Sequence, residues 1–447
     1  MRGLTTTIIL VLVLAGLGGY IYFVESERPA GGVEEREKVF AVEADAIEEV
    51  TVTAEGQTTT LRKTDGTWQI TAPVAVEADS TEVTSLTSAL AALDISRVVA
   101  ENASNLAEYG LAEPRIKISY KAAGGTGGEL HIGEKTPTQG DMYALEPGTT
   151  RVFLVPAYQE TALAKSTFDL RDKQVLHFER DKVDTIEISQ PGQPTIQLAR
   201  AGTEWQLKEP IQVRGDYSTV EGLLTRLDTA AASEIADPNS PASFGLEQPT
   251  AVVTLGAGST RATLEVGTEQ EGTLYARDTG RGLIFKVEPS LAVDLKKTVD
   301  EVRDKDLFEF RTYNVDRLRI TRGSETYEFQ KVAGGGENGA DKWQRIVDGQ
   351  TTDVDLSKME DLASKLSALR AQSFNQTTNA AGQDPTLVVA ASYDGGKFER
   401  VRIISGENDA FGVREGEPGV AVLDADNVKG TITALEAVLN PAPAPAP

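Results

Sequence analysis

The sequence contains no cysteine, and only two of its 447 residues, His131 and His177, are histidines. Without cysteine, disulfide bonds, thiolate metal sites, cysteine nucleophiles and lipid attachment at an N-terminal cysteine are excluded. The two histidines occur in different parts of the chain, and neither belongs to a recognisable Ser–His arrangement. We therefore expect no catalytic, cofactor-binding or metal-binding residues, and no enzymatic activity.

Basic residues are also in the minority, because 44 lysines and arginines face 68 aspartates and glutamates, which gives a net charge of −24. Nucleic-acid binding depends on clustered basic side chains that displace counterions from phosphates, so no nucleic-acid partner is expected. An acidic surface instead keeps a soluble ectodomain dispersed. The length is sufficient for about three domains of ordinary size.

A long apolar run occurs only at the N-terminus, where residues 4–24 carry no charge. As a helix this run would span roughly 30 Å, the thickness of a bilayer's hydrocarbon core. We predict a transmembrane anchor at residues 1–24 and a charged spacer at 25–38. A signal peptide cleaved between Ala15 and Gly19 is the alternative. Both interpretations place the bulk of the chain outside the cytoplasm.

The only three tryptophans, Trp68, Trp205 and Trp343, are 137 and 138 residues apart and mark a repeat. Before each tryptophan the same apolar alternation occurs, which is typical of an antiparallel strand with one buried face. The alternating residues are Ile47, Val50 and Val52, then Val183, Ile186 and Ile188, then Val315, Leu318 and Ile320. We predict three modules, at residues 39–173, 174–305 and 306–438, each with its own core, and a Pro/Ala tail at 439–447.

After each tryptophan, apolar residues recur with helical spacing and predict an amphipathic helix that packs on the sheet. They are Val83, Leu86, Leu90 and Leu93, then Val220, Leu223 and Leu227, then Met359, Leu362, Leu366 and Leu369. Ser218 with Glu221, and Ser357 with Glu360, have the spacing of a capping box at the helix start. In the first module Asp79 or Ser80 is the expected cap.

Further markers follow each helix in the same order. Tyr109-Gly110-Leu111 with Pro114, Phe244-Gly245-Leu246 with Pro249, and a degraded Ala381-Gly382 with Pro385 suit a turn that leads into a strand. Strand segments at 129–133, 263–267 and 402–406 come next. Arg171-Asp172-Lys173 and Arg303-Asp304-Lys305 close the first two modules, where charge pairing between neighbouring modules is expected. The predicted fold class is α+β: an N-terminal transmembrane helix followed by three tandem β-rich modules, each an antiparallel sheet with a packed helix.

The order of these markers resembles a bacterial membrane-anchored family catalogued as domain of unknown function 4340. The resemblance covers nearly the whole chain and is carried by Tyr20-Ile21-Tyr22-Phe23, the strand of Trp68, Tyr109-Gly110-Leu111 and Leu170-Arg171-Asp172-Lys173. It implies a single-pass protein of the bacterial inner membrane, accessory to ABC-type transporters of the gliding-motility kind. The family supplies no agreed catalytic residues, and Ala381 departs from its pattern.

Several patterns that could indicate chemistry have simpler interpretations. The glycines at 124–128 and 334–336 fall where strands should turn, so hairpin loops are expected rather than phosphate loops. Asp353 with Asp355, and Asp424 with Asp426, could bind calcium, but helix capping or solvation fits them better. The repeated tryptophans could stack on sugars, although a residue repeated with its whole strand is more simply a core anchor.

We therefore expect a non-catalytic, membrane-anchored extracytoplasmic binding or scaffold protein with protein partners in the cell envelope. Tandem modules would combine several weak contacts into useful avidity. The alternative is a protein that binds cell-envelope glycans, which would need aromatic side chains exposed on a groove. An envelope hydrolase is a third hypothesis, and no set of residues supports it.

Overall fold

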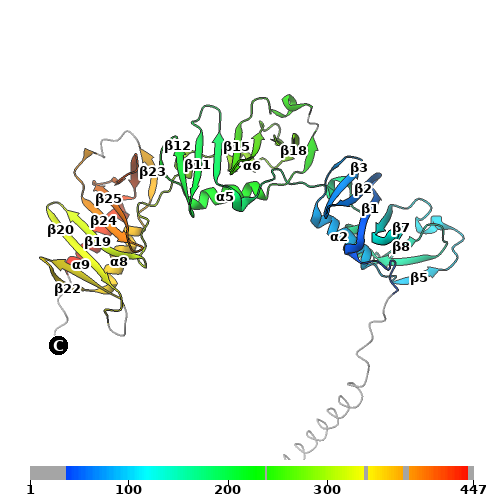
Figure 1. Ribbon diagram of the computed structural model, residues 1–447, viewed down its shortest axis with the longest axis horizontal. Coiled ribbons are helices and arrows are strands. Elements are labelled where there is room, and N and C mark those ends of the chain that lie inside the picture. Colours follow the sequence, from blue (N-terminus) through cyan, green and yellow to red (C-terminus); the bar gives the residue numbers. More distant parts are fainter. Residues whose placement is uncertain (1–36, 237–238, 337–340, 376–381, 441–447) are drawn as a thin grey trace, which may run out of the picture. The chain divides into compact units, whose positions relative to one another are not determined.

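The computed structural model describes residues 37–236, 239–336, 341–375 and 382–440. By their contacts these residues divide after Lys173 into two compact units. The first unit contains one nine-stranded antiparallel sheet and the second contains two. We call the three sheets with their helices modules 1, 2 and 3, in chain order (Figure 1).

The elements of module 1 are η2 (Ala44–Ala46), β1 (Ile47–Ala54), β2 (Gln57–Thr64), β3 (Thr67–Ala72), β4 (Val76–Glu77), α2 (Ser80–Ala91), β5 (Arg97–Ala100), η3 (Leu106–Tyr109), β6 (Ile116–Ala122), η4 (Ala123–Gly125), β7 (Gly127–Lys135), β8 (Asp141–Leu145), β9 (Val152–Pro156), η5 (Ala157–Gln159), α3 (Glu160–Leu163) and α4 (Thr167–Leu170). Those of module 2 are η6 (Arg180–Lys182), β10 (Thr185–Ser189), β11 (Ile196–Ala201), β12 (Glu204–Glu209), β13 (Val213–Arg214), α5 (Tyr217–Asp228), β14 (Glu234–Ala236), η7 (Pro241–Phe244), β15 (Ala251–Ala257), β16 (Thr260–Val266), β17 (Leu274–Asp278), β18 (Leu283–Val287), α6 (Ser290–Leu295) and α7 (Val299–Val302). Those of module 3 are β19 (Val315–Arg322), β20 (Glu325–Val332), β21 (Lys342–Val347), β22 (Gln350–Val354), α8 (Leu356–Ser367), β23 (Ala371–Asn375), β24 (Leu387–Tyr393), β25 (Lys397–Ser405), β26 (Ala410–Arg414), β27 (Val420–Leu423) and α9 (Ala425–Leu439).

The strand order is the same in all three sheets. It is β4-β3-β2-β1-β6-β7-β8-β9-β5 in module 1, and the corresponding strands of modules 2 and 3 follow it without change. The first four strands form a meander, and the helix after them leads to the strand at the opposite edge of the sheet. The chain then returns to the centre for a second meander. The triplication predicted from the sequence is thereby confirmed.

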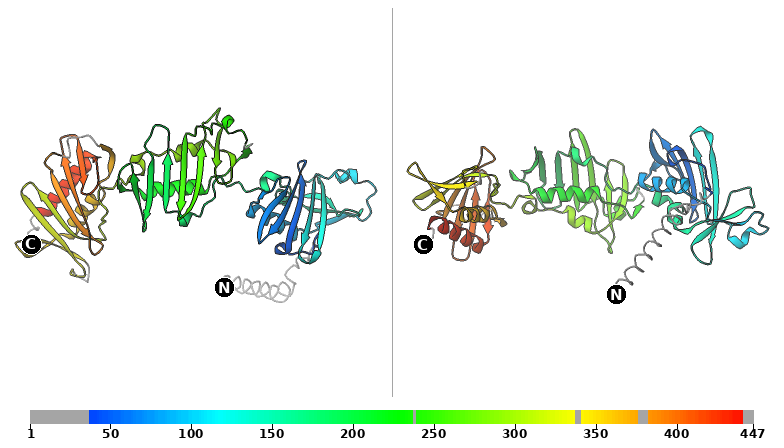
Figure 2. Two further views of the ribbon diagram at one scale, coloured as in Figure 1. Left: turned by 45° about the horizontal axis from the view of Figure 1, so that its top comes forward. Right: turned by 90° about the horizontal axis from the view of Figure 1, so that it is seen from below.

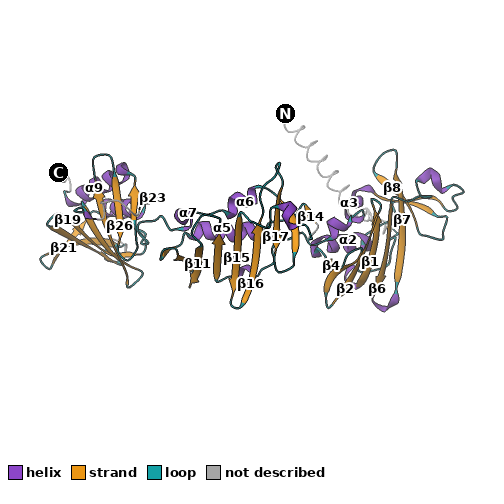
Figure 3. Ribbon diagram, turned by 90° about the horizontal axis from the view of Figure 1, so that it is seen from above, coloured by secondary structure: helices purple, strands orange, loops and turns teal. Residues whose placement is uncertain are grey.

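Alternation along the strands explains which face of each sheet is buried. In β1 the buried residues Val50, Val52 and Ala54 alternate with more exposed ones, and β19 has the same pattern. The helices lie on the buried face, as the ribbon views of module 2 show (Figures 2 and 3). The opposite face is covered by no described helix of its own module, and we call it the open face.

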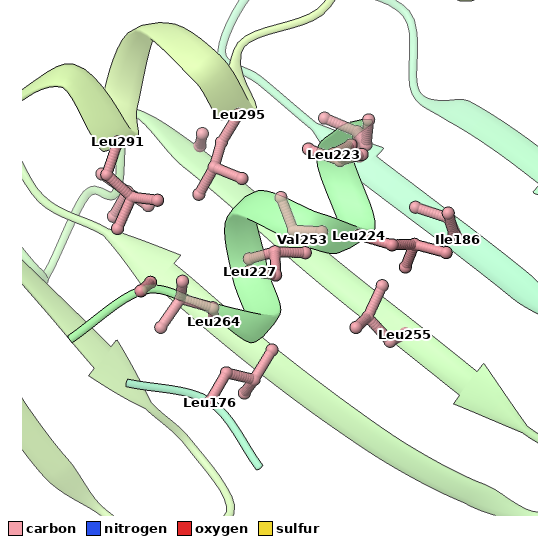
Figure 4. Close-up of a cluster of buried hydrophobic side chains, with 14 of the residues drawn as sticks. Leu176, Ile186, Leu223, Leu224, Leu227, Val253, Leu255, Leu264, Leu291 and Leu295 are labelled. Carbon is pink, nitrogen blue, oxygen red and sulfur yellow. The ribbon is translucent and has the colours of Figure 1, made fainter. Parts of the chain in front are cut away.

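Each module has its own hydrophobic core. The buried clusters comprise residues from Val39 to Leu170, from Val175 to Val302 and from Leu307 to Val438. In module 2 the apolar stripe of α5 supplies Leu223, Leu224 and Leu227, which pack against sheet residues such as Val253 and Leu264 (Figure 4). This stripe is the one that the helical spacing in the sequence predicts.

The predicted fold class is wrong for the helices of each module, and its transmembrane helix is not among the described residues. Among the described residues, none of the helices combines the length and apolar character needed to cross a bilayer. The expected anchor at residues 1–24 and most of the spacer at 25–38 lie outside the described residues, as does the tail from residue 441. The extracytoplasmic location stays a prediction.

The error in the predicted fold class concerns the helices of each module. A sheet of nine strands is roughly 40 Å wide, whereas a 12-residue helix such as α5 is only about 18 Å long. One packed helix therefore cannot cover the buried face. Modules 1 and 2 add two short helices each, α3 with α4 and α6 with α7, and module 3 ends in the 15-residue helix α9 instead.

The capping boxes predicted at Ser218 and Ser357 are also wrong, because both helices begin earlier. Asp216 and Asp355 are the N-caps, and their carboxylates accept hydrogen bonds from the backbone N–H of Thr219 and Lys358. Asp79 caps α2 in the same way, which confirms one of the two expected caps in module 1. An aspartate at this position suits the orphan N–H groups and the dipole of the helix.

Candidate functional site

The three tryptophans are buried, with only 9%, 1% and 1% of Trp68, Trp205 and Trp343 exposed. In module 2 the indole N–H of Trp205 donates a hydrogen bond of 3.0 Å to Glu221. The guanidinium of Arg200 lies 4.9 Å from the centroid of the same ring. A ring enclosed in this way cannot stack on a sugar, so the core-anchor interpretation is confirmed and sugar stacking on these residues is wrong.

Glu221 does not cap its helix but links three segments of module 2. Besides Trp205, its carboxylate accepts hydrogen bonds from Arg180 at 3.2 Å and from Arg200 at 2.9 Å. Burial by itself would raise the pKa of Glu221. The hydrogen bonds from Trp205 and Arg180 and the charge of Arg200 outweigh this effect and lower the pKa below its usual 4.5.

Replacing Glu221 with glutamine should destabilise module 2 at neutral pH and have a smaller effect in acid. A carboxyl whose pKa is lower in the folded state stabilises the protein above its unfolded pKa, and this contribution is lost as the pH falls through the folded pKa. The urea midpoint of module 2 should therefore differ between wild type and Glu221→Gln at pH 7, and the difference should be smaller at about pH 3. The urea midpoint is measured by the fluorescence of Trp205, in a chain in which Trp68 and Trp343 are replaced by phenylalanine.

The matched control is Glu269→Gln, because Glu269 is exposed in the same module. It should leave the midpoint unchanged at both pH values. A Glu221→Gln effect of equal size at pH 7 and in acid would contradict the assigned role of the carboxylate.

Modules 2 and 3 share a charged network around Glu417, which lies in the turn between β26 and β27. Its carboxylate accepts hydrogen bonds from Arg214 of β13 at 2.6 Å and from Arg303 at 3.4 Å. Arg303 is 3% exposed, and its guanidinium lies 3.6 Å from the ring centroid of Phe374. Asp304 accepts from Arg214 at 2.7 Å. The second Arg-Asp-Lys motif thus contributes Arg303 to a pairing across the junction and Asp304 to a pairing within module 2.

A second buried carboxylate, Glu399 of β25, organises the start of module 3. It is 4% exposed and accepts the backbone N–H of Glu309 and of Phe310, each at 3.0 Å. Arg414 of β26 pairs with Glu399 and also with Glu309, at 3.0 Å. The chain that enters module 3 is therefore fixed to the sheet through one buried charge and its partners.

A cleft of about 530 Å³ lies beside this junction. Tyr217 of α5 and Tyr313, which precedes β19, line it and are 58% and 79% exposed. Arg370 in the same cleft pairs with Asp216 at 3.3 Å and with Asp306 at 3.7 Å. Exposed aromatic rings among hydrogen-bonding charges are the chemistry of a site for a polar ligand.

The open faces of the three sheets differ in charge at equivalent positions. In module 1, Glu49 pairs with Arg62 at 2.7 Å and with Lys121 at 2.5 Å. In module 2, Glu265 pairs with Arg277 at 2.5 Å. Glu49 on the central strand of module 1 corresponds to Thr185 in module 2 and to Arg317 in module 3. Each of the three directly precedes a buried residue at the same place in the strand pairing, namely Val50, Ile186 and Leu318.

In module 3 the open face is hollowed, and arginines gather there. The hollow of about 410 Å³ is lined by Arg317, Arg319, Thr321, Thr326, Val388, Ala390, Ser392, Phe398 and Arg400. Arg319 pairs with Glu328. Within the part of the chain that the structure describes, the side chains of Arg317 and Arg400 form neither a salt bridge nor a hydrogen bond. Phe398 is 65% exposed.

The other residues singled out in the sequence have structural places. Asp355 and Asp424 cap α8 and α9, while Asp353 pairs with Lys342 at 3.0 Å. His131 lies on β7 and contacts Glu129 at 2.8 Å. His177 approaches Arg281 at 3.3 Å.

Gly124 and Gly125 form the turn between β6 and β7, and Gly334 and Gly335 lie in the turn after β20. Asp426 donates its backbone N–H to Asp424, and Ala381 lies outside the described residues.

The sequence did not indicate the hollow, because the strand segment predicted at 402–406 in module 3 is not the true equivalent of the segments at 129–133 and 263–267. The pairing of Leu130 with Ile118, of Leu264 with Val253 and of Val401 with Val389 makes Arg400 the equivalent of Glu129. The predicted segment at 402–406 is therefore two residues too late. With the correct register, the charge change from Glu129 to Arg400 would have been visible in the sequence.

The model of the family described as "Domain of unknown function (DUF4340)" matches residues 68–243 and again residues 205–386. The chain belongs to this family. Each match begins at the tryptophan of one module and ends inside the next, so the family's unit crosses a module boundary. The resemblance inferred from the sequence markers is confirmed, whereas membrane anchoring does not follow from the match.

None of the curated proteins matches the chain. Among solved structures, a putative DNA polymerase III beta subunit from Eubacterium rectale ATCC 33656 is similar at 6% identity and a TM-score of 0.19, over 86% of this chain and 92% of that one. The DNA polymerase III subunit beta from Pseudomonas aeruginosa has 9% identity and a TM-score of 0.17, over 87% and 94%. At such TM-scores the likeness supports no conclusion about this family member.

Proposed function

We propose that this protein is a non-catalytic scaffold that binds partner proteins through the open faces of its three sheets. The supporting observation is that one nine-stranded frame occurs three times with its helices on one face, while the charges on the other face differ between modules. Residues on an open face do not build the core, so they are free to specialise for different contacts. Three such faces on one chain would combine weak contacts into avidity.

The finer proposal is that the partner belongs to an ABC-type transporter or another complex of the cell envelope. It is supported by the resemblance seen in the sequence, which implies an accessory role beside such transporters. Binding rather than catalysis is proposed because the described charged clusters, around Glu417 and Glu399, are engaged in joining segments of the fold.

Photo-cross-linking in cells tests the scaffold function. A photoreactive residue is introduced on each open face, at Lys117, Glu187 or Phe398, and on exposed helix positions of the same modules, at Ser88, Thr225 or Ser364. We expect cross-links to a second protein from at least one open-face position and none from the helix positions. Equal cross-linking from both sets, or none from any position, would contradict the proposal.

Binding of a cell-envelope glycan in the cleft between modules 2 and 3 is a second candidate, favoured by the exposure of Tyr217 and Tyr313. Soluble peptidoglycan fragments titrated into the full chain should bind, and Tyr217→Ala with Tyr313→Ala should abolish the signal. Tyr158→Ala is the control, since Tyr158 is 78% exposed in module 1. If wild type binds no fragment, this candidate is removed.

A further inference from the structure

We infer that the hollow on the open face of module 3 binds a short acidic segment of a partner protein. The inference rests on the proposed scaffold function and names the partner's chemistry. Three guanidinium groups, of Arg317, Arg319 and Arg400, line the hollow together with hydroxyl groups. None of the nine lining residues is acidic.

Two of the three guanidinium groups of this hollow, those of Arg317 and Arg400, have no carboxylate partner among the described residues, whereas Arg319 pairs with Glu328. On the open face of module 1, Glu49 neutralises both Arg62 and Lys121. In module 3 the positions of Glu49 and Glu129 are occupied by Arg317 and Arg400, so two carboxylates have been replaced by two cations on the same frame. The fold does not require this exchange, because module 1 forms the same sheet with glutamates.

Carboxylates are the groups that such a surface recognises best. A planar guanidinium donates two parallel hydrogen bonds to one carboxylate, and hydroxyl groups such as those of Thr321 and Ser392 can donate to its remaining lone pairs. Phe398, 65% exposed at the rim, offers an apolar contact beside the charges. A peptide in which acidic residues adjoin an apolar one matches this arrangement.

The size of the basic surface favours a short segment over a long polyanion. The chain has a net charge of −24, and electrostatic attraction or repulsion extends only about 8 Å at physiological ionic strength. A nucleic acid or long anionic glycan would extend beyond the hollow to the acidic remainder of the molecule. A segment of a few residues would place its carboxylates within reach of the arginines alone.

The test uses the full chain and a fluorescent peptide of about eight residues that alternates glutamate and leucine, with a glutamine–leucine peptide as the neutral match. Fluorescence anisotropy should show binding of the first peptide and not of the second. Arg317→Glu with Arg400→Glu gives module 3 the residues of module 1 and should weaken binding at least about tenfold. Arg317→Lys with Arg400→Lys should retain part of the affinity. Lysine keeps the positive charge but cannot donate the two parallel hydrogen bonds of a guanidinium to one carboxylate.

The matched control is Lys365→Glu with Lys429→Glu, which makes the same change of net charge on helices α8 and α9 of the same module. Its affinity should stay within about twofold of wild type. Equal weakening by both double variants, equal binding of the two peptides, or tighter binding of an RNA or heparin oligomer of equal charge would overturn the inference. Cross-links from Phe398 to a protein would still support the scaffold function in that case, so the two failures can be told apart.

Discussion

Glu399→Ala is expected to destabilise module 3 by about 3–5 kcal/mol. The substitution removes the acceptor for two backbone N–H groups, of Glu309 and Phe310, and leaves the guanidinium of Arg414 with a weakened set of partners. Breaking one side of a buried charge pair costs more than the pair contributes, because the remaining charge stays desolvated. Hydrogen exchange read peptide by peptide should show faster exchange throughout module 3.

Glu415→Ala is the control, since Glu415 is exposed in the turn after β26, next to Arg414, and should change stability by less than about 0.5 kcal/mol. The loss of stability in Glu399→Gln should lie between those of Glu399→Ala and Glu415→Ala, because the amide retains one acceptor oxygen. If Glu399→Ala exchanged as slowly as wild type, the buried network would not be holding the start of module 3.

Gly245→Ala and Gly267→Ala should each destabilise module 2 by about 3 kcal/mol or more. Gly245 has a φ of 68°, and a Cβ there would lie 2.7 Å from the backbone nitrogen of Thr268. A Cβ on Gly267 would lie 2.2 Å from the carbonyl oxygen of Phe244. The two glycines therefore allow the turn after η7 to press against the end of β16. Gly110 and Gly133 form the same contact in module 1.

Gly222→Ala provides the opposite expectation within the same module. Gly222 lies inside α5, and a Cβ there would meet nothing within 4 Å. Alanine should stabilise the helix by about 0.5–1 kcal/mol. Urea unfolding of module 2 should therefore give shifts of opposite sign for Gly222→Ala and Gly245→Ala. A Gly245→Ala variant as stable as wild type would show that the turn yields without cost.

The sequence predicted the repeat because each marker reflects a local constraint. The tryptophan is an anchor of the core, the Tyr-Gly-Leu and Phe-Gly-Leu turns need a glycine with positive φ, and the helical stripe must face the sheet. These constraints act within a few residues or through a fixed period, so they are visible in one sequence. The strand order could not be predicted, since β6 returns to the centre of the sheet beside β1 through pairing that no local pattern specifies.

The candidate surfaces were harder to find than the fold. The role of Glu221 depends on Trp205, Arg180 and Arg200, which come together only in three dimensions. Glu399 looks like any other of the 68 acidic residues until its backbone donors are seen. The net charge of −24 gives no sign of the basic hollow of module 3, because a sum over the whole chain does not show where charges gather.

Hydroxyl-radical footprinting of the full chain in cells and after purification tests most directly whether the open faces are the binding surfaces. Phe398 reports on the open face of module 3, and Leu356 of α8 and Val293 of α6 report on helices, with 65%, 38% and 72% of their surfaces exposed. We expect Phe398 to be oxidised more slowly in cells than in the purified chain, while the two helix residues react equally in both. Equal oxidation of Phe398 in both settings, or protection of all three residues alike, would contradict binding through the open face of module 3.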